Sequence, residues 1–389
     1  AIFRHAQLLA SEVFYAGHQA TRYHNHAWFQ DLVLLAVTLS FPGWPGAQRW
    51  RDIAINRLED QFSQLIRRDN GYAVFVENSI GYHHGVQRIT EFAGNLAKLS
   101  DRETVIPGIA EDLLKFGKFF RYPDQRRTPS QGDTFRRPNS EAANPRGQIA
   151  YGAQRAVFLR ETGYAVVQSD HQGRPFMVCF LATSLSRTHK HEDNLSFTVY
   201  FDGIEWLIDP SFYSHEYSAP ISAYLRSAAA HNGVFLRELD YSIEPGLARL
   251  DGKVNGGVCS LSGHHDCYEG IRISRYLHCS LDKLDIVGRD NLSKPSPGAQ
   301  LRFHCGEHVS ASVDKGKVLL SHPGSLFRLV IDLGQRNIER VHGNQVDGPR
   351  FGGVAAHGFR QRTEIDTLIV DFQSDTEIAW HLWAEDRSS

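Results

Sequence analysis

The sequence predicts an α+β protein of two domains, a helical domain over residues 1–145 and a domain of antiparallel β-strands packed as a sandwich over residues 146–389. Three observations predict this class. Apolar residues recur at helical spacing in the first domain. A polar, turn-rich stretch over residues 122–134 follows the last helical pattern. Beyond residue 148 the apolar residues form short runs separated by turn residues, with no long helices between them.

Four helices are expected in the first domain. Residues 26–41 are almost wholly apolar after Asp31, as in a helix that is buried on most sides. Three further helices each show one apolar face, marked by Trp50, Ile53, Leu58, Phe62, Leu65 and Ile66, by Val86, Ile89, Phe92, Leu96 and Leu99, and by Ile109, Leu113, Phe116 and Phe120. Short loops, such as residues 41–46 and Asn70–Gly71, connect the helices, so we expect antiparallel helical hairpins.

Short β-rich runs mark the second domain. The clearest are Ala156–Leu159, Tyr164–Val167, Phe197–Phe201, Leu284–Val287 and Leu368–Phe372. Asp202-Gly203 lies between two such runs and is a strong signal for a β-hairpin turn.

Composition excludes several classes of function. The chain has 389 residues, 41% of them hydrophobic and 22% charged, and a net charge of −2, so no global field attracts nucleic acid or an anionic membrane. No apolar run approaches the roughly 20 residues of a membrane span. Five cysteines without a Cys-x-x-Cys pair make a thiolate zinc site unexpected. The sequence does not specify an oligomeric state.

The most informative motif is His189-Lys190-His191-Glu192-Asp193-Asn194, which precedes a predicted strand. In an extended backbone the two histidines would lie on one face. Imidazole is both the usual general base near neutral pH and the commonest metal ligand. Asp209 and His231, each beside an apolar run, complete a His/His/Asp/His set. The alternative is that these are ordinary polar residues at strand ends.

These residues resemble a known signature. His-Lys-His-Glu-Asp-Asn-Leu-Ser-Phe, then Asp209-Pro210-Ser-Phe-Tyr, then His231-Asn-Gly-Val is similar to the β-domain of heparinase II/III-type polysaccharide lyases. Members of that family typically have His-Gly-His-x-Asp-x-x-Ser-Phe, Asp-Pro-Gly-x-Tyr and His-Asn-Thr. The chain departs from the pattern at Lys190 and Ser211, where glycine is usual, and at Gly233, where threonine is usual.

The helical half resembles the same family. Tyr23-His24-Asn25-His26 is similar to the family's Asn-His segment at the start of an inner helix, and Asn78–Gln87 is similar to the segment with its catalytic tyrosine, here Tyr82. Residues 123–134 resemble the family's Pro-Asp-Gly…Gly-Asp-Ser link. The resemblance implies an incomplete (α/α) toroid followed by an antiparallel β-sandwich, with the catalytic groups between them. It also implies a periplasmic or secreted bacterial protein, whose signal peptide is not part of this chain.

The resemblance assigns roles in β-elimination. Asn25 and His26 would stabilise the charge that develops on a uronate carboxylate. Tyr82 and His189 would carry the two proton transfers. A tyrosine needs nearby positive charge to act as a base, and His83, His84 and Arg88 are close in sequence. The alternatives are that Asn25 caps its helix and that Tyr82 is a half-buried aromatic residue.

A metal site is also expected. His191, Asp209 and His231 are predicted to bind one divalent ion, and two imidazoles with one carboxylate favour zinc over calcium. By resemblance this ion is structural and orients the strand that bears His189. The alternative is that Asp209 caps a turn while His231 bonds to the backbone. Substrate contacts are expected from Arg88, Tyr217, Tyr224 and Arg226.

The predicted function is therefore a polysaccharide lyase that acts on an acidic, uronate-containing polysaccharide. Two alternatives stay open. In a metal-dependent glycan hydrolase all four residues of the His/His/Asp/His set would bind one ion and activate water. In a non-catalytic carbohydrate-binding protein the fold would remain without the chemistry. Neither nucleic acid nor a membrane is expected as a partner.

Overall fold

The structure is a computed structural model that describes residues 1–17, 23, 25–136, 156–343 and 352–387. Of these it leaves the side chains at positions 16, 17, 25 and 26 undescribed. Two compact units share the chain. The helical unit comprises residues 1–77 and 82–118, and the β unit comprises residues 78–81 and 119–389.

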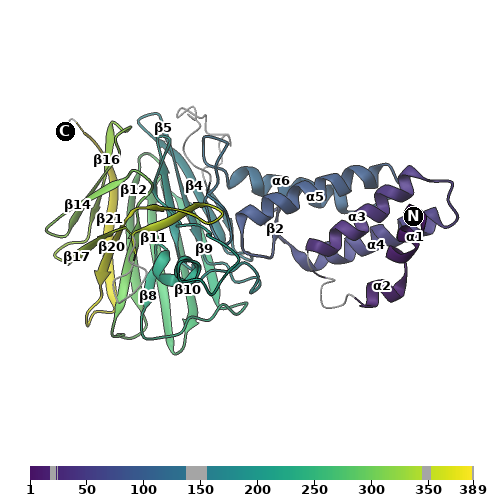
Figure 1. Cartoon of the computed structure of the whole chain (residues 1–389). Coiled ribbons are helices and arrows are strands. Elements are labelled where there is room, and N and C mark those ends of the chain that lie inside the picture. Colours follow the sequence, from purple (N-terminus) through teal and green to yellow (C-terminus); the bar gives the residue numbers. More distant parts are fainter. Residues whose placement is uncertain (18–22, 24, 137–155, 344–351, 388–389) are drawn as a thin grey trace. The chain divides into compact units, whose positions relative to one another are not determined.

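The helical unit contains the predicted helices at close to the predicted bounds. In chain order its helices are α1 (Ile2–Leu9), α2 (Glu12–Gly17), α3 (Asn25–Ser40), α4 (Ala47–Leu65), α5 (Ile80–Lys98) and α6 (Ile106–Phe119). In Figure 1, α3 and α4 lie side by side, as do α5 and α6. Trp28 is fully buried between Phe62 and Phe75, with ring centroids 4.8 and 5.7 Å away.

The prediction that Asn70-Gly71 links two helices is wrong. The pair forms the tight turn of a small β-hairpin, β1 (Ile66–Asp69) and β2 (Tyr72–Phe75), between α4 and α5. Both turn residues have positive φ, 51° and 77°. Asn-Gly is the pair that most readily adopts this conformation, and its twist matches that of the flanking strands. The Asn-Gly dipeptide therefore marks a β-hairpin turn and not a loop between two helices.

The β unit is built from antiparallel sheets. A five-stranded sheet has the order β3 (Ala156–Leu159), β4 (Tyr164–His171), β5 (Arg174–Leu181), β6 (Phe197–Phe201) and β7 (Ile204–Leu207). An eight-stranded sheet has the order β14 (Ser310–Asp314), β15 (Lys317–Ser321), β16 (Phe327–Asp332), β21 (Glu377–Asp386), β12 (Asp285–Leu292), β11 (Ile271–Ser280), β10 (Val258–Tyr268) and β9 (Ala248–Asn255).

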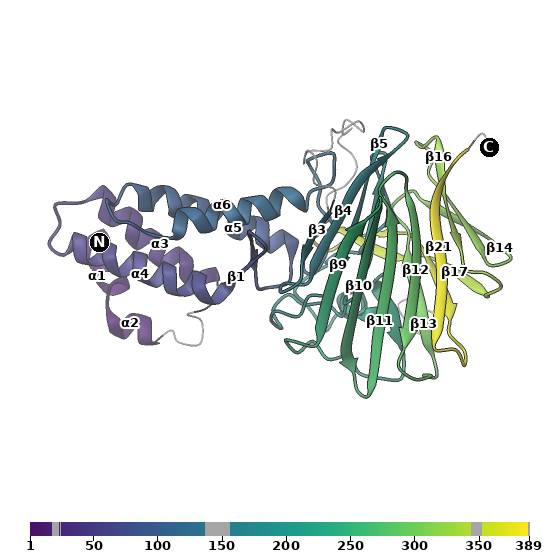
Figure 2. The ribbon, with the colours of Figure 1, turned by 180° about the vertical axis from the view of Figure 1, so that it is seen from behind.

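Smaller elements complete this unit. A four-stranded sheet has the order β17 (Ile338–His342), β20 (Asp366–Asp371), β13 (Ala299–His304) and β8 (Val234–Leu236), and β18 (Val354–Gly358) pairs with β19 (Gln361–Glu364). Helix α7 (Pro220–Arg226) and the 3₁₀ turn η2 (Ala228–Ala230) precede β8. Figure 2 shows β9, β10, β11, β12 and β21 as neighbouring strands.

One hydrophobic core joins these sheets. Its buried side chains come from the five-stranded sheet, including Phe197 and Trp206, from the eight-stranded sheet, including Trp380, and from the four-stranded sheet, including Phe303. Phe197 stacks on Trp380 at 5.3 Å. The long eight-stranded sheet shows the expected alternation, since β11 has buried and more exposed residues at every second position.

The predicted strands agree with the observed ones. Ala156–Leu159 and Phe197–Phe201 are strands with the predicted bounds, and Asp202-Gly203 turns β6 into β7 with positive φ at both residues. The predicted domain boundary at residues 145–146 lies outside the described residues and stays a prediction. Within the part of the chain that the structure describes, no helix combines the length and apolar character needed to cross a membrane.

Candidate active site and metal site

The loop between β5 and β6, residues 182–196, carries the histidine motif. His189 has a φ of 53°, so the backbone at this residue is left-handed. The two histidines were expected to share one face only in an extended backbone, and His189 does not meet this condition. His189 and His191 are nevertheless brought together, because both contact the same carboxylate. Their side chains are 11% and 0% exposed.

That carboxylate belongs to Asp133, which lies in the connector before β3. His189 Nδ1 is 2.6 Å from Asp133 Oδ2, and His191 Nε2 is 2.8 Å from Oδ1. The Tyr217 hydroxyl donates a third hydrogen bond to Oδ2 at 2.9 Å. The Asp133 side chain is fully buried. Burial by itself raises the pKa of such a carboxyl, but the hydrogen bonds from His189 and His191 outweigh it and hold the pKa of Asp133 well below its usual range.

The three predicted metal ligands also come together. His191, Asp209 and His231 are buried, and one candidate ligand atom from each lies within 4.8 Å of the others. His231 Nδ1 is 2.9 Å from Asp209 Oδ2. Burial tends to lower the pKa of His231, but the Asp209 carboxylate raises it above its ordinary value. Two nitrogens of this set, His191 Nδ1 and His231 Nε2, have no hydrogen-bond partner among the described residues.

The unpaired nitrogens are the observation that tests a metal here. A buried polar atom without a partner normally destabilises a fold, so such atoms call for a ligand. A divalent ion accepts lone pairs from neutral imidazole and from carboxylate, which is the donor set present. Asp209 also accepts a hydrogen bond from Ser211 N at 3.2 Å, so it caps a turn as well. The residues therefore fit a metal ion.

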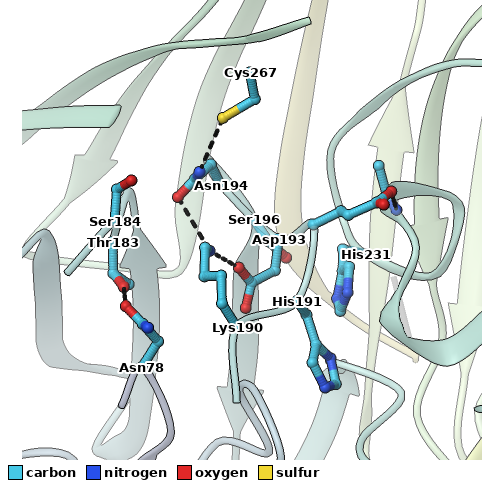
Figure 3. A network of polar contacts seen from close by, with 12 residues as sticks. Asn78, Thr183, Ser184, Lys190, His191, Asp193, Asn194, Ser196, His231 and Cys267 are labelled. Atoms are coloured by element: carbon cyan, nitrogen blue, oxygen red, sulfur yellow. Dashed lines mark hydrogen bonds and ion pairs between the residues drawn. The ribbon is translucent and has the colours of Figure 1, made fainter. Parts of the chain in front are cut away.

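Lys190, where the related signature has glycine, is a buried cation. Its ammonium contacts the carboxylate of Asp193, and it donates to Asn194 Oδ1 at 3.3 Å. Asn194 in turn donates to Cys267 Sγ at 3.3 Å. Figure 3 shows the Lys190 side chain directed toward Asp193 and Asn194, with the rings of His191 and His231 beside this network. The network holds the turn that carries His189 and His191.

A second anchor for the loop is Asn78, which belongs to the β unit. Its amide donates to Ser186 O at 2.7 Å and to Thr188 O at 3.3 Å. Its Oδ1 accepts from Thr183 Oγ1 at 2.7 Å and from Leu185 N at 3.1 Å. Figure 3 shows the contact between Asn78 and Thr183. The loop that leads to His189 is thus held along most of its length.

Two of the predicted substrate contacts border His189. The Arg226 guanidinium lies 3.9 Å from the centre of the Tyr217 ring, and it donates to Lys190 O at 3.2 Å. Tyr217 is 38% exposed, and Arg226 is half-buried. The Arg226 guanidinium therefore stacks on an aromatic ring whose hydroxyl donates to Asp133.

The other two predicted substrate contacts lie elsewhere. Tyr224 is 4% exposed and packs in a small apolar cluster with α7 and β18. This burial argues against contact with a polymer. Arg88 is exposed on α5 of the helical unit. It borders an apolar surface pocket whose other lining residues are Phe29, Leu32, Val33, Ala36, Ile89 and Phe92.

In the helical unit, Tyr82 lies in the first turn of α5, and it is half-buried. The expectation that His83 supplies positive charge to it is wrong. His83 is fully buried, accepts a hydrogen bond from Phe75 N and is 3.0 Å from Leu113 O through Nε2. Burial lowers the pKa of His83 to about 3, so its ring is neutral at pH 7. Asn25 begins α3, but the side chains of Asn25 and His26 lie outside the described residues.

Asp133 is the site residue that sequence reasoning missed. It lies in the connector of residues 123–134, 56 positions before His189, and the sequence analysis predicts no role for it. The signal available in the sequence was the Gly132-Asp133-Thr134 segment, and the structure shows Gly132 at a φ of 61°. Such a glycine marks a backbone held in one special conformation, and the residue after it is then held too.

Comparisons with known proteins identify the family of this chain. The chain matches two family models, "Heparinase II/III N-terminus" over residues 4–150 and "Heparinase II/III-like, C-terminal" over residues 152–381. No curated protein sequence matches the chain.

Solved structures with similar folds include the heparan sulfate lyase HepC from Pedobacter heparinus, with a TM-score of 0.78, 16% identity and coverage of 94% of this chain and 61% of that one. A heparinase III structure has a TM-score of 0.72 and 14% identity, with coverage of 92% and 60%. The chain thus spans about three fifths of the length of these proteins. Together the two family models cover nearly all of its residues, and the chain belongs to the heparinase II/III-like family.

Proposed function

We propose that this chain is a polysaccharide lyase that cleaves an acidic, uronate-containing polysaccharide by β-elimination. Membership of the heparinase II/III-like family supports the class of reaction. The observation that carries the proposal is the pair of His189 and Asp133, a partly exposed imidazole held at 2.6 Å by a buried carboxylate. A histidine in this setting is oriented for proton transfer at the surface.

The reaction needs two proton transfers and no water. The C5 proton of the uronate leaves to a base, a double bond forms between C4 and C5, and the C4–O4 bond breaks. The leaving O4 takes a proton from an acid. We assign these transfers to His189 and Tyr82, each of which can give or take a proton.

Charge builds up on the uronate carboxylate as C5 loses its proton. Donors that face this charge lower the barrier most, and Asn25 and His26 are proposed for that role because they match the family's Asn-His segment. Arg226 is proposed to bind a substrate carboxylate, since its planar fork suits two parallel hydrogen bonds. Its stacking on Tyr217 supports this, because the ring limits the orientations of the guanidinium.

We further propose that His191, Asp209 and His231 hold one divalent ion, zinc in preference to calcium. The unpaired nitrogens of both histidines support it, as does the donor set of two imidazoles and one carboxylate. The ion would supply cross-linking between the histidine loop and the segments of Asp209 and His231. These ligands are at most 2% exposed, which favours a structural ion over one that activates water for hydrolysis.

The finer architecture follows from the same reasoning. We propose that the helical unit is part of an incomplete (α/α) toroid and that the β unit is an antiparallel β-sandwich. We also propose a periplasmic or secreted location, as the family resemblance implies.

The experiment is a screen of uronate polymers, among them heparan sulfate, alginate, hyaluronan and chondroitin, for the absorbance of the unsaturated product. We expect the chromophore with at least one polymer, and we expect Tyr82→Phe and His189→Ala to abolish it while circular dichroism stays unchanged. New reducing ends without the chromophore would identify a hydrolase. Binding without either product would identify a carbohydrate-binding protein.

The metal is tested separately. Elemental analysis of the purified protein should find one ion per chain, and His231→Ala should lose it. Removal by chelator should lower the melting temperature and the activity together, because His189 is then less well placed. Protein without bound metal that is indifferent to chelator would contradict this part of the proposal.

A further inference from the structure

The contacts of Asp133 determine which ring nitrogen carries the proton in His189 and in His191, as well as where the two rings lie. Its carboxylate is fully buried and receives hydrogen bonds from His189 Nδ1, from His191 Nε2 and from the Tyr217 hydroxyl. An ionised carboxylate has no proton to donate, so each of these partners must be the donor. His189 therefore carries its proton on Nδ1, and His191 carries its proton on Nε2.

We propose that Asp133 is a positioning residue that fixes opposite tautomers in His189 and His191, and so prepares one ring for proton transfer and the other for metal binding. The inference rests on the proposed function for the meaning of these two tasks. The tautomers themselves follow from the hydrogen bonds that the two rings make to an ionised Asp133 carboxylate.

The opposite tautomers have different consequences for the two rings. In His191 the lone pair lies on Nδ1, and this is the nitrogen that has no hydrogen-bond partner among the described residues. It belongs to the residue set that could hold an ion with Asp209 and His231. In neutral His189 the lone pair lies on Nε2, which is the nitrogen that can take a proton from a substrate. A single carboxylate thus serves both functions, and its contact with His191 is the kind that commonly fixes the tautomer of a metal-bound histidine.

The backbone around Asp133 is held tightly enough for this role. Gly132 has a φ of 61°, and a Cβ added there would lie 2.3 Å from Asn78 O and 3.0 Å from His189 O. On the other side, Thr134 Oγ1 donates to Gln131 O at 2.5 Å and accepts from Gly81 N at 2.9 Å. Because neighbours enclose the segment on both sides, the carboxylate cannot follow a histidine that rotates away.

Asp133→Asn gives the sharpest test, since the amide has nearly the same shape but only one oxygen. Its Oδ1 can accept from one histidine, and its NH₂ then faces the other, whose proton must move to the opposite nitrogen. If His189 changes tautomer, its lone pair leaves Nε2. If His191 changes, its lone pair leaves Nδ1. Either exchange damages one of the two functions, so Asp133→Asn should lower kcat by about 10²- to 10⁴-fold, while KM changes little.

The direct readout is the tautomer of each ring, from ¹⁵N shifts of histidine-labelled protein, with His189 and His191 assigned from the spectra of His189→Ala and His191→Ala. We expect Nδ1–H for His189 and Nε2–H for His191 in the wild type. In Asp133→Asn one of them should switch. Asp251→Asn removes a carboxylate from an exposed ion pair with Arg160 and should change neither tautomer nor kcat.

The outcomes separate this inference from the proposed function. A wild type with the two expected tautomers but no unsaturated product from any polymer would leave the positioning role standing and overturn the lyase. Active wild type with the same tautomer in both rings would overturn the positioning role. So would an Asp133→Asn variant that keeps both tautomers and wild-type kcat.

Discussion

The buried ion pair between Lys190 and Asp193 tests how firmly the histidine loop is held. Their side chains are 1% and 2% exposed. Lys190→Met keeps the aliphatic stem and removes the ammonium, which leaves the Asp193 carboxylate buried without its counter-ion. Breaking a buried pair in this way lowers the free energy of unfolding by about 3–5 kcal/mol, because nothing then offsets the desolvation of the remaining charge.

The double variant Lys190→Met with Asp193→Asn removes both charges. It should lower the free energy of unfolding by only about 1–2 kcal/mol, the range expected when a buried polar side chain keeps part of its hydrogen bonding. The two changes should therefore be non-additive by at least about 2 kcal/mol, with the double variant more stable than Lys190→Met alone. Lys253→Met, at an exposed position of β9, is the matched control and should change stability by less than about 0.5 kcal/mol.

The cysteines provide an assay for the β unit alone. All five are buried free thiols, and all five lie between residues 179 and 305, inside that unit. Pulsed thiol labelling across a urea gradient, read by mass spectrometry, follows unfolding of this unit without a signal from the helical unit. Two results would contradict this account of the buried ion pair. One is a loss of less than about 1 kcal/mol in the free energy of unfolding for Lys190→Met. The other is a double variant that is less stable than Lys190→Met.

Three further predictions concern both units. Burial raises the pKa of Asp31 from its ordinary 3.8 to about 6. The free energy of unfolding of the helical unit should therefore be highest below about pH 4 and fall by about 3 kcal/mol as the pH rises through 6. Asp31→Asn should flatten this pH dependence in urea titrations followed by circular dichroism. Gly132→Ala should cost about 2 kcal/mol or more, since it adds a collision to an unfavourable φ, and Gly173→Ala, with a φ of 73° and open space around it, should cost visibly less by the same assay. Asn78→Gly permits the same left-handed backbone but removes the side-chain hydrogen bonds to the loop. Hydrogen exchange of the amides in residues 183–188 should therefore accelerate. Unchanged exchange would show that Asn78 does not anchor this loop.

Local patterns predicted the elements well where one physical cause dominates. The apolar spacing between residues 26 and 41 gave a helix within one residue of α3, and the run Phe197–Phe201 was a strand with its exact bounds. The prediction for Asn70-Gly71 was wrong because it rested on the helical patterns that precede and follow this part of the sequence. The φ preference of the dipeptide, a local property, decided the outcome.

The site was predictable only in part, for a different reason. His191, Asp209 and His231 were found from their order along the chain, and the structure brings their ligand atoms together. Asp133 could not be found in that way. Its pairing with His189 depends on how the connector folds back across 56 positions, and no spacing rule encodes such a contact. The burial of His83, which removes it as a source of charge, is likewise a tertiary property.

Lys190 is compatible with a metal ion nearby, because its ammonium pairs with a carboxylate that is not a proposed metal ligand. An ammonium directed at Asp209 would compete with the ion for its only carboxylate ligand. Lys190 instead contacts Asp193, whose pKa stays below its ordinary value although burial raises it. Asp209 instead pairs with His231 and stays available to the proposed ion. Lys190→Gly, which restores the residue usual in related signatures, should therefore weaken the β unit in thiol labelling but leave one ion per chain by elemental analysis. Loss of the ion in Lys190→Gly would mean that the lysine organises the metal ligands and not merely the loop.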